Sequence, residues 1–145
     1  MKALIQRVKR ASVTINGELY SSIGKGILVL LGVEKFDEIE NAQRLAQKVA
    51  NLRIFEDEND RMNFSVKDVN GEILVVSQFT LCGDCKKGTR PSFDKAAQPE
   101  KANSLYEDFV RMLKDDGFDV KTGKFRAMMD VELINDGPVT FMVEK

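Results

Sequence analysis

Residues 3–33 read ALIQRVKRASVTINGELYSSIGKGILVLLGV, and this stretch decides the fold class. Ala3 to Ile15 is rich in β-branched residues and ends at Asn16-Gly17, a dipeptide typical of tight hairpin turns. Leu19 to Ile23 is the expected return strand. Ile27 to Val33 is apolar on both faces, which indicates a central strand of a sheet.

Two amphipathic helices are expected further along the chain. Asp37 is predicted to begin the first, with Glu40 three residues later as its capping-box partner. Pro99 suits the first turn of the second helix, and Gly117 suits its C-terminal cap. The helical period is carried by Ile39, Ala42, Leu45, Ala46, Val49 and Leu52 in the first, and by Ala102, Leu105, Tyr106, Phe109, Val110 and Leu113 in the second.

The remaining apolar segments predict more strands, joined mostly by short turns. Phe64 to Val69 and Glu72 to Phe79 flank Asn70-Gly71, which predicts a second hairpin. The last strands are expected at Phe118 to Val120, Met128 to Ile134 and Val139 to Val143, the final two separated by Asp136-Gly137-Pro138.

Short connections between neighbouring strands favour antiparallel pairing. With roughly seven or eight strands and two helices, we expect an α+β fold. It is a mostly antiparallel curved sheet or partial β-barrel with two amphipathic helices packed on it. The length of 145 residues suits a single domain spanning residues 1–145.

The chain contains no histidine, which excludes several kinds of site. A Ser-His-Asp triad, a Cys-His pair and a histidine-ligated zinc ion all require that residue. The two cysteines, Cys82 and Cys85, form a CxxC unit that could be a redox pair or half of a zinc site. Because the residues that follow resemble a loop rather than a helix, we favour two reduced thiols. No metal or cofactor is expected.

The hydropathy pattern favours a cytoplasmic protein with no membrane segment. The longest apolar run, Ile27 to Leu31, is far shorter than the roughly 20 residues that span a bilayer. The net charge of −1 argues against a general nucleic-acid binder. Two local basic stretches remain, Arg7 to Arg10 and Lys86 to Arg90. They are either solvated surface charge or, if they share a face, a site for a phosphate backbone.

Two polar segments are candidates for chemistry. Ser77-Gln78-Phe79-Thr80 directly follows the apolar run Ile73 to Val76, so its side chains and backbone N–H groups could line a pocket at a strand end. A capped strand end is the plainer interpretation. Asn135 to Thr140 contains Asp-Gly-Pro and would ordinarily be a turn.

Together these segments closely resemble the signature of the D-aminoacyl-tRNA deacylase family. The resemblance covers nearly the whole chain, and Cys82 and Cys85 lie outside it. Further matching pieces are Ile5-Gln6-Arg7-Val8, Ala11-Ser12-Val13, Asn51-Leu52-Arg53-Ile54-Phe55 and Lys87-Gly88-Thr89-Arg90-Pro91-Ser92-Phe93.

The resemblance implies a homodimer with active sites at the subunit interface. It implies hydrolysis of the ester that joins a D-amino acid, or glycine, to the terminal ribose of tRNA. Gly137 and Pro138 would form a cis peptide that reaches the partner's site and excludes L-residues sterically. Arg7 would hold this loop in place, and Met129 would be a pocket residue near it.

The absence of histidine is compatible with such a reaction, because an aminoacyl ester is already activated. Backbone N–H groups near Phe79 and Thr80 could stabilise the oxyanion, with Ser77 and Gln78 beside them, and the ribose 2′-hydroxyl could assist water. With no basic partner, Thr80 is expected to position the substrate rather than attack it. Lys86, Lys87 and Arg90 are candidate tRNA contacts.

A non-catalytic RNA-binding module on a small β-barrel is the main alternative. Such modules stack bases on aromatic side chains in a basic groove. The chain has no Trp and 2 Tyr, and many of its 9 Phe lie in apolar runs, which weakens this interpretation. A cysteine redox protein is the third interpretation.

Overall fold

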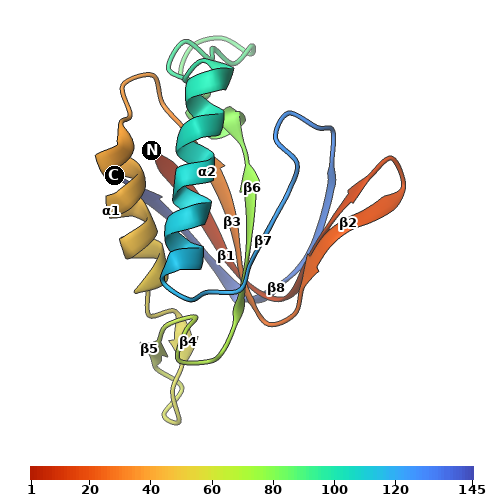
Figure 1. Cartoon of the computed structure of the whole chain (residues 1–145), viewed down its shortest axis with the longest axis vertical. Coiled ribbons are helices and arrows are strands. Elements are labelled where there is room, and N and C mark those ends of the chain that lie inside the picture. The colour runs from red at the N-terminus through yellow and green to blue at the C-terminus, as the bar shows by residue number, and fades with distance from the viewer.

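The computed structural model describes residues 1–145. Two helices lie side by side on one face of a strongly curved sheet (Figure 1). In chain order the elements are β1 (Lys2–Ile15), β2 (Glu18–Ile23), β3 (Gly26–Gly32), α1 (Ile39–Ala50), β4 (Phe55–Glu56), β5 (Met62–Phe64), β6 (Glu72–Ser77), a 3₁₀ helix (Phe79–Cys82), α2 (Pro99–Asp115), β7 (Val120–Thr122) and β8 (Asp130–Glu144). The expected α+β fold is confirmed.

The long strand β1 organises the sheet because it pairs on both edges. Its first half pairs with β3, its second half pairs with β2, and β8 runs antiparallel along its other edge. The sheet order is β2-β1-β3-β6-β7. The two ends of this order approach each other, and Ser21 Oγ donates a hydrogen bond to the Thr122 carbonyl oxygen at 2.7 Å. The sheet is therefore a nearly closed barrel with one unsealed seam.

Apolar residues pack on both faces of this sheet. The larger core lies between the sheet and the helices, where Leu45 and Val49 of α1 and Phe109 and Leu113 of α2 are fully buried. A smaller core lies on the opposite face and includes Leu28, Leu74 and Val76. None of the helices is both long enough and apolar enough to span a membrane.

Both predicted helices form, but the first begins later than expected. Glu38, not Asp37, is its N-cap, and the capping box uses Asn41 in place of Glu40. Asp37 is buried instead, where it accepts hydrogen bonds from the amino group of Met1 and from the N–H of Glu34. The second helix has Pro99 in its first turn, and Gly117 follows it with a left-handed φ of 87°.

The second hairpin prediction is wrong. Asn70 has a left-handed φ of 50°, as in a tight turn, but the strands on its two sides do not pair. β5 pairs with β4, whereas β6 lies parallel between β3 and β7. The strand expected at Phe118 to Val120 is found two residues later, at β7. Most pairings are nonetheless antiparallel.

The segment around Gly137 and Pro138 does not separate two strands. β8 runs continuously through it and pairs with β1 on both sides. The pairing register shifts between Gln6 and Val8 and again between Val8 and Arg10, so Asp136 to Pro138 bulge out of the sheet. What the sequence presents as a turn is a bulge in a long strand.

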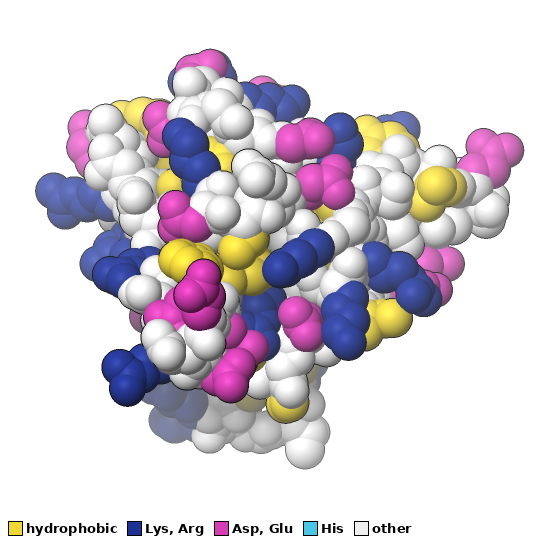
Figure 2. All heavy atoms as spheres, turned by 90° about the horizontal axis from the view of Figure 1, so that it is seen from below, with side chains coloured by type: hydrophobic (Ala, Val, Ile, Leu, Met, Phe, Trp, Pro, Cys, Tyr) yellow, Lys and Arg dark blue, Asp and Glu magenta, His cyan; other side chains and the backbone are white.

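One face of the molecule carries charges of both signs (Figure 2). Figure 2 views the molecule from below, where Lys and Arg side chains lie among Asp and Glu side chains with apolar groups between them. No broad patch of a single sign covers this face (Figure 2).

Candidate active site

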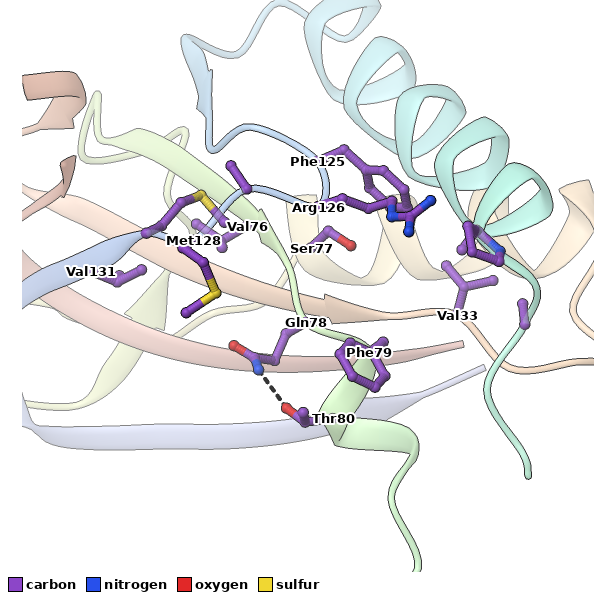
Figure 3. A pocket seen from close by; sticks show the side chains of 15 residues that line it. Val33, Val76, Ser77, Gln78, Phe79, Thr80, Phe125, Arg126, Met128 and Val131 are labelled. Carbon is purple, nitrogen blue, oxygen red and sulfur yellow. Dashed lines mark hydrogen bonds between the residues drawn. The ribbon is translucent and has the colours of Figure 1, made fainter. Parts of the chain in front are cut away.

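A cavity of about 650 Å³ opens beyond the carboxyl end of β6, next to the start of α2 (Figure 3). Its volume falls within the range typical of small-molecule sites. Fifteen residues line it, ten of them hydrophobic: Val33, Val76, Ser77, Gln78, Phe79, Thr80, Ala97, Pro99, Ala102, Phe125, Arg126, Ala127, Met128, Met129 and Val131.

All four residues of the polar segment predicted from the sequence border this cavity. Ser77 ends β6, and Gln78 caps the 3₁₀ helix that contains Phe79 and Thr80. The Gln78 side-chain amide donates a hydrogen bond to Thr80 Oγ1, drawn as the dashed line in Figure 3. Thr80 Oγ1 has no other side-chain partner, so no carboxylate or amine is in place to remove its proton.

Close packing against β3 fixes the position of the 3₁₀ helix. The Gln78 N–H donates to the Leu31 carbonyl oxygen at 2.8 Å. A Cβ atom at Gly32 would lie 3.1 Å from the Leu81 Cβ and 3.2 Å from the Cys82 Sγ, so only glycine allows this approach without displacement. The N–H groups of Phe79 and Thr80 open the helix, where amides have no acceptor within it.

Met129 lines the same cavity, although it is far from the polar segment in the sequence. The backbone N–H of Lys124 donates to its sulfur at 3.4 Å. A Cβ atom on Gly123 would lie 2.8 Å from that sulfur, so the glycine makes room for the thioether. Met128, by contrast, is 91% exposed at the rim.

Arg7 holds the bulge of β8 through a buried guanidinium. Its Nε donates to the Asp136 carbonyl oxygen at 2.8 Å, and its Nη1 donates to the Ile54 carbonyl oxygen at 2.8 Å. Its Nη2 lies 3.5 Å from a carboxylate oxygen of Glu56. The Arg7 side chain is 6% exposed, so its hydrogen bonds to the two carbonyl oxygens are largely shielded from water and connect the bulge to the body of the fold, whereas the Glu56 side chain is 51% exposed.

Asn135 fixes the bulge from within. Its side-chain oxygen accepts a hydrogen bond from the Val139 N–H at 2.7 Å, and its amide donates to the Val139 carbonyl oxygen at 3.2 Å. The Gly137–Pro138 peptide bond between these anchors is cis. Gly137 and Pro138 are exposed and do not line the cavity.

The structure thus brings together two separate groups of predicted site residues. Ser77 to Thr80 meet Met129 at the cavity, and Arg7 meets the Gly137-Pro138 bulge elsewhere on the same chain.

The predicted tRNA contacts Lys86, Lys87 and Arg90 lie in neither group. They are exposed on the loop between the 3₁₀ helix and α2. At the base of this loop Asp84 and Ser92 pair, and the Lys86 N–H donates to the Asp84 carboxylate at 2.9 Å. That hydrogen bond lowers the pKa of Asp84.

Ten of the fifteen residues that line the cavity were not predicted as site residues, and Ala102, Phe125 and Arg126 are three of them. Ala102 belongs to the apolar face of α2, and the helical period of that face predicted only that the residue packs in the core. Phe125 and Arg126 lie in the connection between β7 and β8, where no pattern marks them. Arg126 adopts a left-handed φ of 61°, a property that the sequence does not reveal.

The two cysteines are free, as expected. Cys82 is buried, and its thiol lies 3.4 Å from the Val33 carbonyl oxygen, whereas Cys85 is exposed. Burial raises the pKa of the Cys82 thiol, which disfavours the thiolate needed for disulfide exchange. No three Cys, Asp or Glu side chains are arranged so that they could hold a metal ion.

Comparison with known proteins gives a consistent result. The family model described as D-Tyr-tRNA(Tyr) deacylase matches residues 4–144. A "D-aminoacyl-tRNA deacylase" of Thermodesulfovibrio yellowstonii is 60% identical over 143 residues, covering 99% of this chain and 98% of the relative. One of Colwellia psychrerythraea is 60% identical over 141 residues, with 97% of each chain covered.

A solved structure titled "c-Myc DNA Unwinding Element Binding Protein" has the same fold over the whole chain. It superposes with a TM-score of 0.95 at 45% sequence identity, covering 100% of this chain and 99% of that one. With a family model that spans almost every residue and relatives at this level of identity, the chain belongs to the D-Tyr-tRNA(Tyr) deacylase family.

Proposed function

We propose that this protein hydrolyses the ester bond of tRNA that carries a D-amino acid or glycine, and that it spares L-aminoacyl-tRNA. Family membership supports the reaction class. The observation that carries the proposal is the cavity at the end of β6, where a polar segment that includes the first N–H groups of the 3₁₀ helix faces a largely apolar space. Such a site suits a terminal nucleoside and the ester attached to it.

The proposed chemistry uses the backbone more than side chains. N–H groups at Phe79 and Thr80 would donate to the oxyanion that develops when water attacks the ester carbonyl. The ribose 2′-hydroxyl of the substrate would assist that water. No histidine exists in the chain, and no base contacts the Thr80 hydroxyl, so attack by a threonine nucleophile lacks a proton acceptor.

Thr80→Ala should therefore retain much of the wild-type rate. The substitution removes the hydroxyl that accepts the Gln78 hydrogen bond but keeps the backbone N–H group. We expect kcat to fall less than about tenfold, which corresponds to about 1.4 kcal/mol of transition-state stabilisation. Single-turnover hydrolysis of D-aminoacyl-tRNA measures this. Rates near background, or an aminoacyl group trapped on Thr80, would establish the hydroxyl as nucleophile.

We also infer that two copies of the chain form the working enzyme. Gly137 and Pro138 are exposed, rigidly anchored and outside the cavity of their own chain, so only another subunit could place them at an active site. Apolar side chains flank them on β8: Ile134 is 37%, Phe141 39% and Met142 49% exposed. A second copy would cover these surfaces and set the Gly137 and Pro138 carbonyls against the substrate's α-ammonium group, where an L-side chain would clash.

The direct test uses purified protein with D-aminoacyl-, glycyl- and L-aminoacyl-tRNA and measures release of labelled amino acid. We expect release from the first two only, and sedimentation velocity should give a dimer. Equal hydrolysis of the D- and L-esters would refute the chiral filter. Binding of tRNA without any hydrolysis would instead favour the non-catalytic RNA-binding module.

The exposed loop that carries Lys86, Lys87 and Arg90 is proposed to contact tRNA phosphates. The double variant Lys86→Ala, Lys87→Ala should bind tRNA with a shallower salt dependence, because each lost phosphate contact reduces the log–log slope by about 0.7–0.9. The matched control is Arg44→Ala, Lys48→Ala, which removes two exposed cations from α1. Filter binding at several salt concentrations measures both slopes. An unchanged slope in the loop variant would show that this loop does not contact the tRNA phosphates.

A further inference from the structure

A second cavity, of about 520 Å³, adjoins the candidate active site, and Phe125 lines both. One wall is a single face of α2, with residues spaced three or four apart from Asn103 to Asp115. The other wall is the segment from Thr122 to Phe125, and Tyr20 of β2 contributes from the barrel side. We refer to this space as the α2–β7 cleft.

The α2–β7 cleft contains three aromatic rings, of which Tyr20 is exposed, Phe125 is half-buried and Tyr106 is buried. The rings of Tyr106 and Phe125 lie 6.1 Å apart between centroids. The Tyr106 hydroxyl donates to the Val75 carbonyl oxygen at 3.0 Å, which fixes the ring against β6. Tyr20 is 50% exposed and forms no side-chain hydrogen bond, so its ring is free to meet a ligand. Nucleic-acid bases stack on aromatic rings of this kind with little dependence on sequence.

Three cations without an ion pair line the two cavities. Lys114 and Lys124 line the α2–β7 cleft, and Arg126 lines the candidate active site; none of the three forms an ion pair within the chain. Figure 3 draws the Arg126 side chain beside Phe125, on the side of the active-site cavity toward α2. Of the other charged groups in the cleft, Arg111 is paired with Asp108, Glu107 accepts a hydrogen bond from Asn103, and Asp115, next to Lys114, is an exposed carboxylate without an ion pair.

We propose that the α2–β7 cleft binds the nucleotide that precedes the terminal one in the single-stranded 3′ end of tRNA. This rests on the proposed function, in which the terminal aminoacylated nucleoside occupies the first cavity. The RNA must then leave that cavity along a neighbouring surface, and Phe125 connects it directly to the cleft. Lys114, Lys124 and Arg126 would bind the phosphates, while Tyr20 would stack on the base.

The test compares two substrates of the intact protein: D-aminoacyl-tRNA and D-aminoacyl-adenosine, which has the terminal nucleoside but no phosphate. The double variant Lys114→Ala, Lys124→Ala should raise KM for the tRNA substrate about tenfold and reduce the log–log salt slope by about 0.7 for each lost contact. Its kinetics on the adenosine ester should match those of the wild type. Lys121→Ala is the matched control, because Lys121 lies on β7, is paired with Asp119 and does not line the cleft.

Tyr20 supplies a second, independent readout. Tyr20→Ala should raise KM for the tRNA substrate about tenfold without changing kcat, whereas Tyr20→Phe keeps the ring and should behave as wild type. Circular dichroism and thermal melting check that each variant is folded. Rescue by phenylalanine distinguishes stacking from a general structural effect.

Two results would overturn the inference while leaving the proposed function intact. One is an unchanged KM for tRNA in both the lysine and Tyr20 variants, which would show that the cleft does not bind the RNA. The other is an equal loss on tRNA and on the adenosine ester. If the wild type hydrolyses neither substrate, the proposed function fails. The cleft is then tested by fluorescence anisotropy with a labelled single-stranded RNA of the tRNA 3′ sequence. Unchanged binding by the lysine variant would refute the inference that the cleft binds RNA.

Discussion

Arg7→Ala should lower kcat/KM for D-aminoacyl-tRNA by about 100-fold or more, because it releases the bulge that is proposed to line the partner's site. The guanidinium is the group that links the Asp136 carbonyl to the body of the fold, and it is almost completely buried. Small displacements of a positioning group cost this much even when the chemistry itself is untouched. Steady-state kinetics on D-aminoacyl-tRNA measure the loss.

The same substitution should also destabilise the fold. Hydrogen bonds that involve a charged group contribute about 1.5–3 kcal/mol each, so the free energy of unfolding should fall by roughly 3 kcal/mol. Urea unfolding measures this and identifies the conditions under which the variant is fully folded for the kinetic assay. Arg7→Lys keeps the charge but replaces the planar fork of donors with a single ammonium group, so we expect an intermediate loss.

Arg10→Ala is the control for Arg7, since Arg10 lies on the same strand but is 62% exposed. Its ion pair with Glu132 is on the surface, and surface pairs contribute about 0–1 kcal/mol. Activity and stability should both stay near the wild-type values. If Arg7→Ala retains full activity on D-esters at a concentration where it is folded, the bulge has no part in catalysis.

Local signals in the sequence account for the parts of the fold that were predicted well. Asn16 and Gly17 have left-handed φ values of 51° and 80°, which these two residue types adopt readily, so the first hairpin follows from its turn. Pro99 and Gly117 likewise bound α2 through their own backbone preferences. In each case the decisive residues are neighbours in the chain.

Partner choice between distant strands could not be predicted in this way. Asn70 adopts the turn conformation that its residue type favours, yet β6 pairs with β3 and β7, which lie across helical connections from it. Parallel pairing of this kind is decided by which strands bury the apolar faces of α1 and α2, and no local dipeptide encodes it. The bulge in β8 was missed for the same reason, because it exists only relative to the register of β1.

The candidate site divides along similar lines. The abrupt change from Val76 to the polar segment Ser77 to Thr80 marked one wall of the cavity from the sequence alone. The opposite wall is built from Ala102, Phe125 and Arg126, which join the site only through the packing of α2 on the sheet. Their residue types are equally common in ordinary cores and surfaces.

Filling the cavity should abolish activity without removing any polar group. Ala102 lines the cavity from α2, and Ala102→Trp should occupy the space that the substrate needs, so kcat/KM should fall at least about 100-fold. Overpacking of this kind costs roughly 1–3 kcal/mol, which thermal melting will measure. Ala127→Trp blocks the same cavity from the connection between β7 and β8 and serves if the first variant unfolds, while Ala102→Ser is the size-matched control.

Mixing the two inactive proteins then tests whether the bulge acts across subunits. In a heterodimer of Arg7→Ala with Ala102→Trp, the open cavity of the first subunit faces the intact bulge of the second. If the bulge works in its partner's site, subunit exchange should restore about a quarter of wild-type activity, because random pairing leaves one intact site in half of the dimers. If the bulge served its own subunit, every site in the heterodimer would carry either a filled cavity or a displaced bulge. The mixture would then stay as inactive as its components.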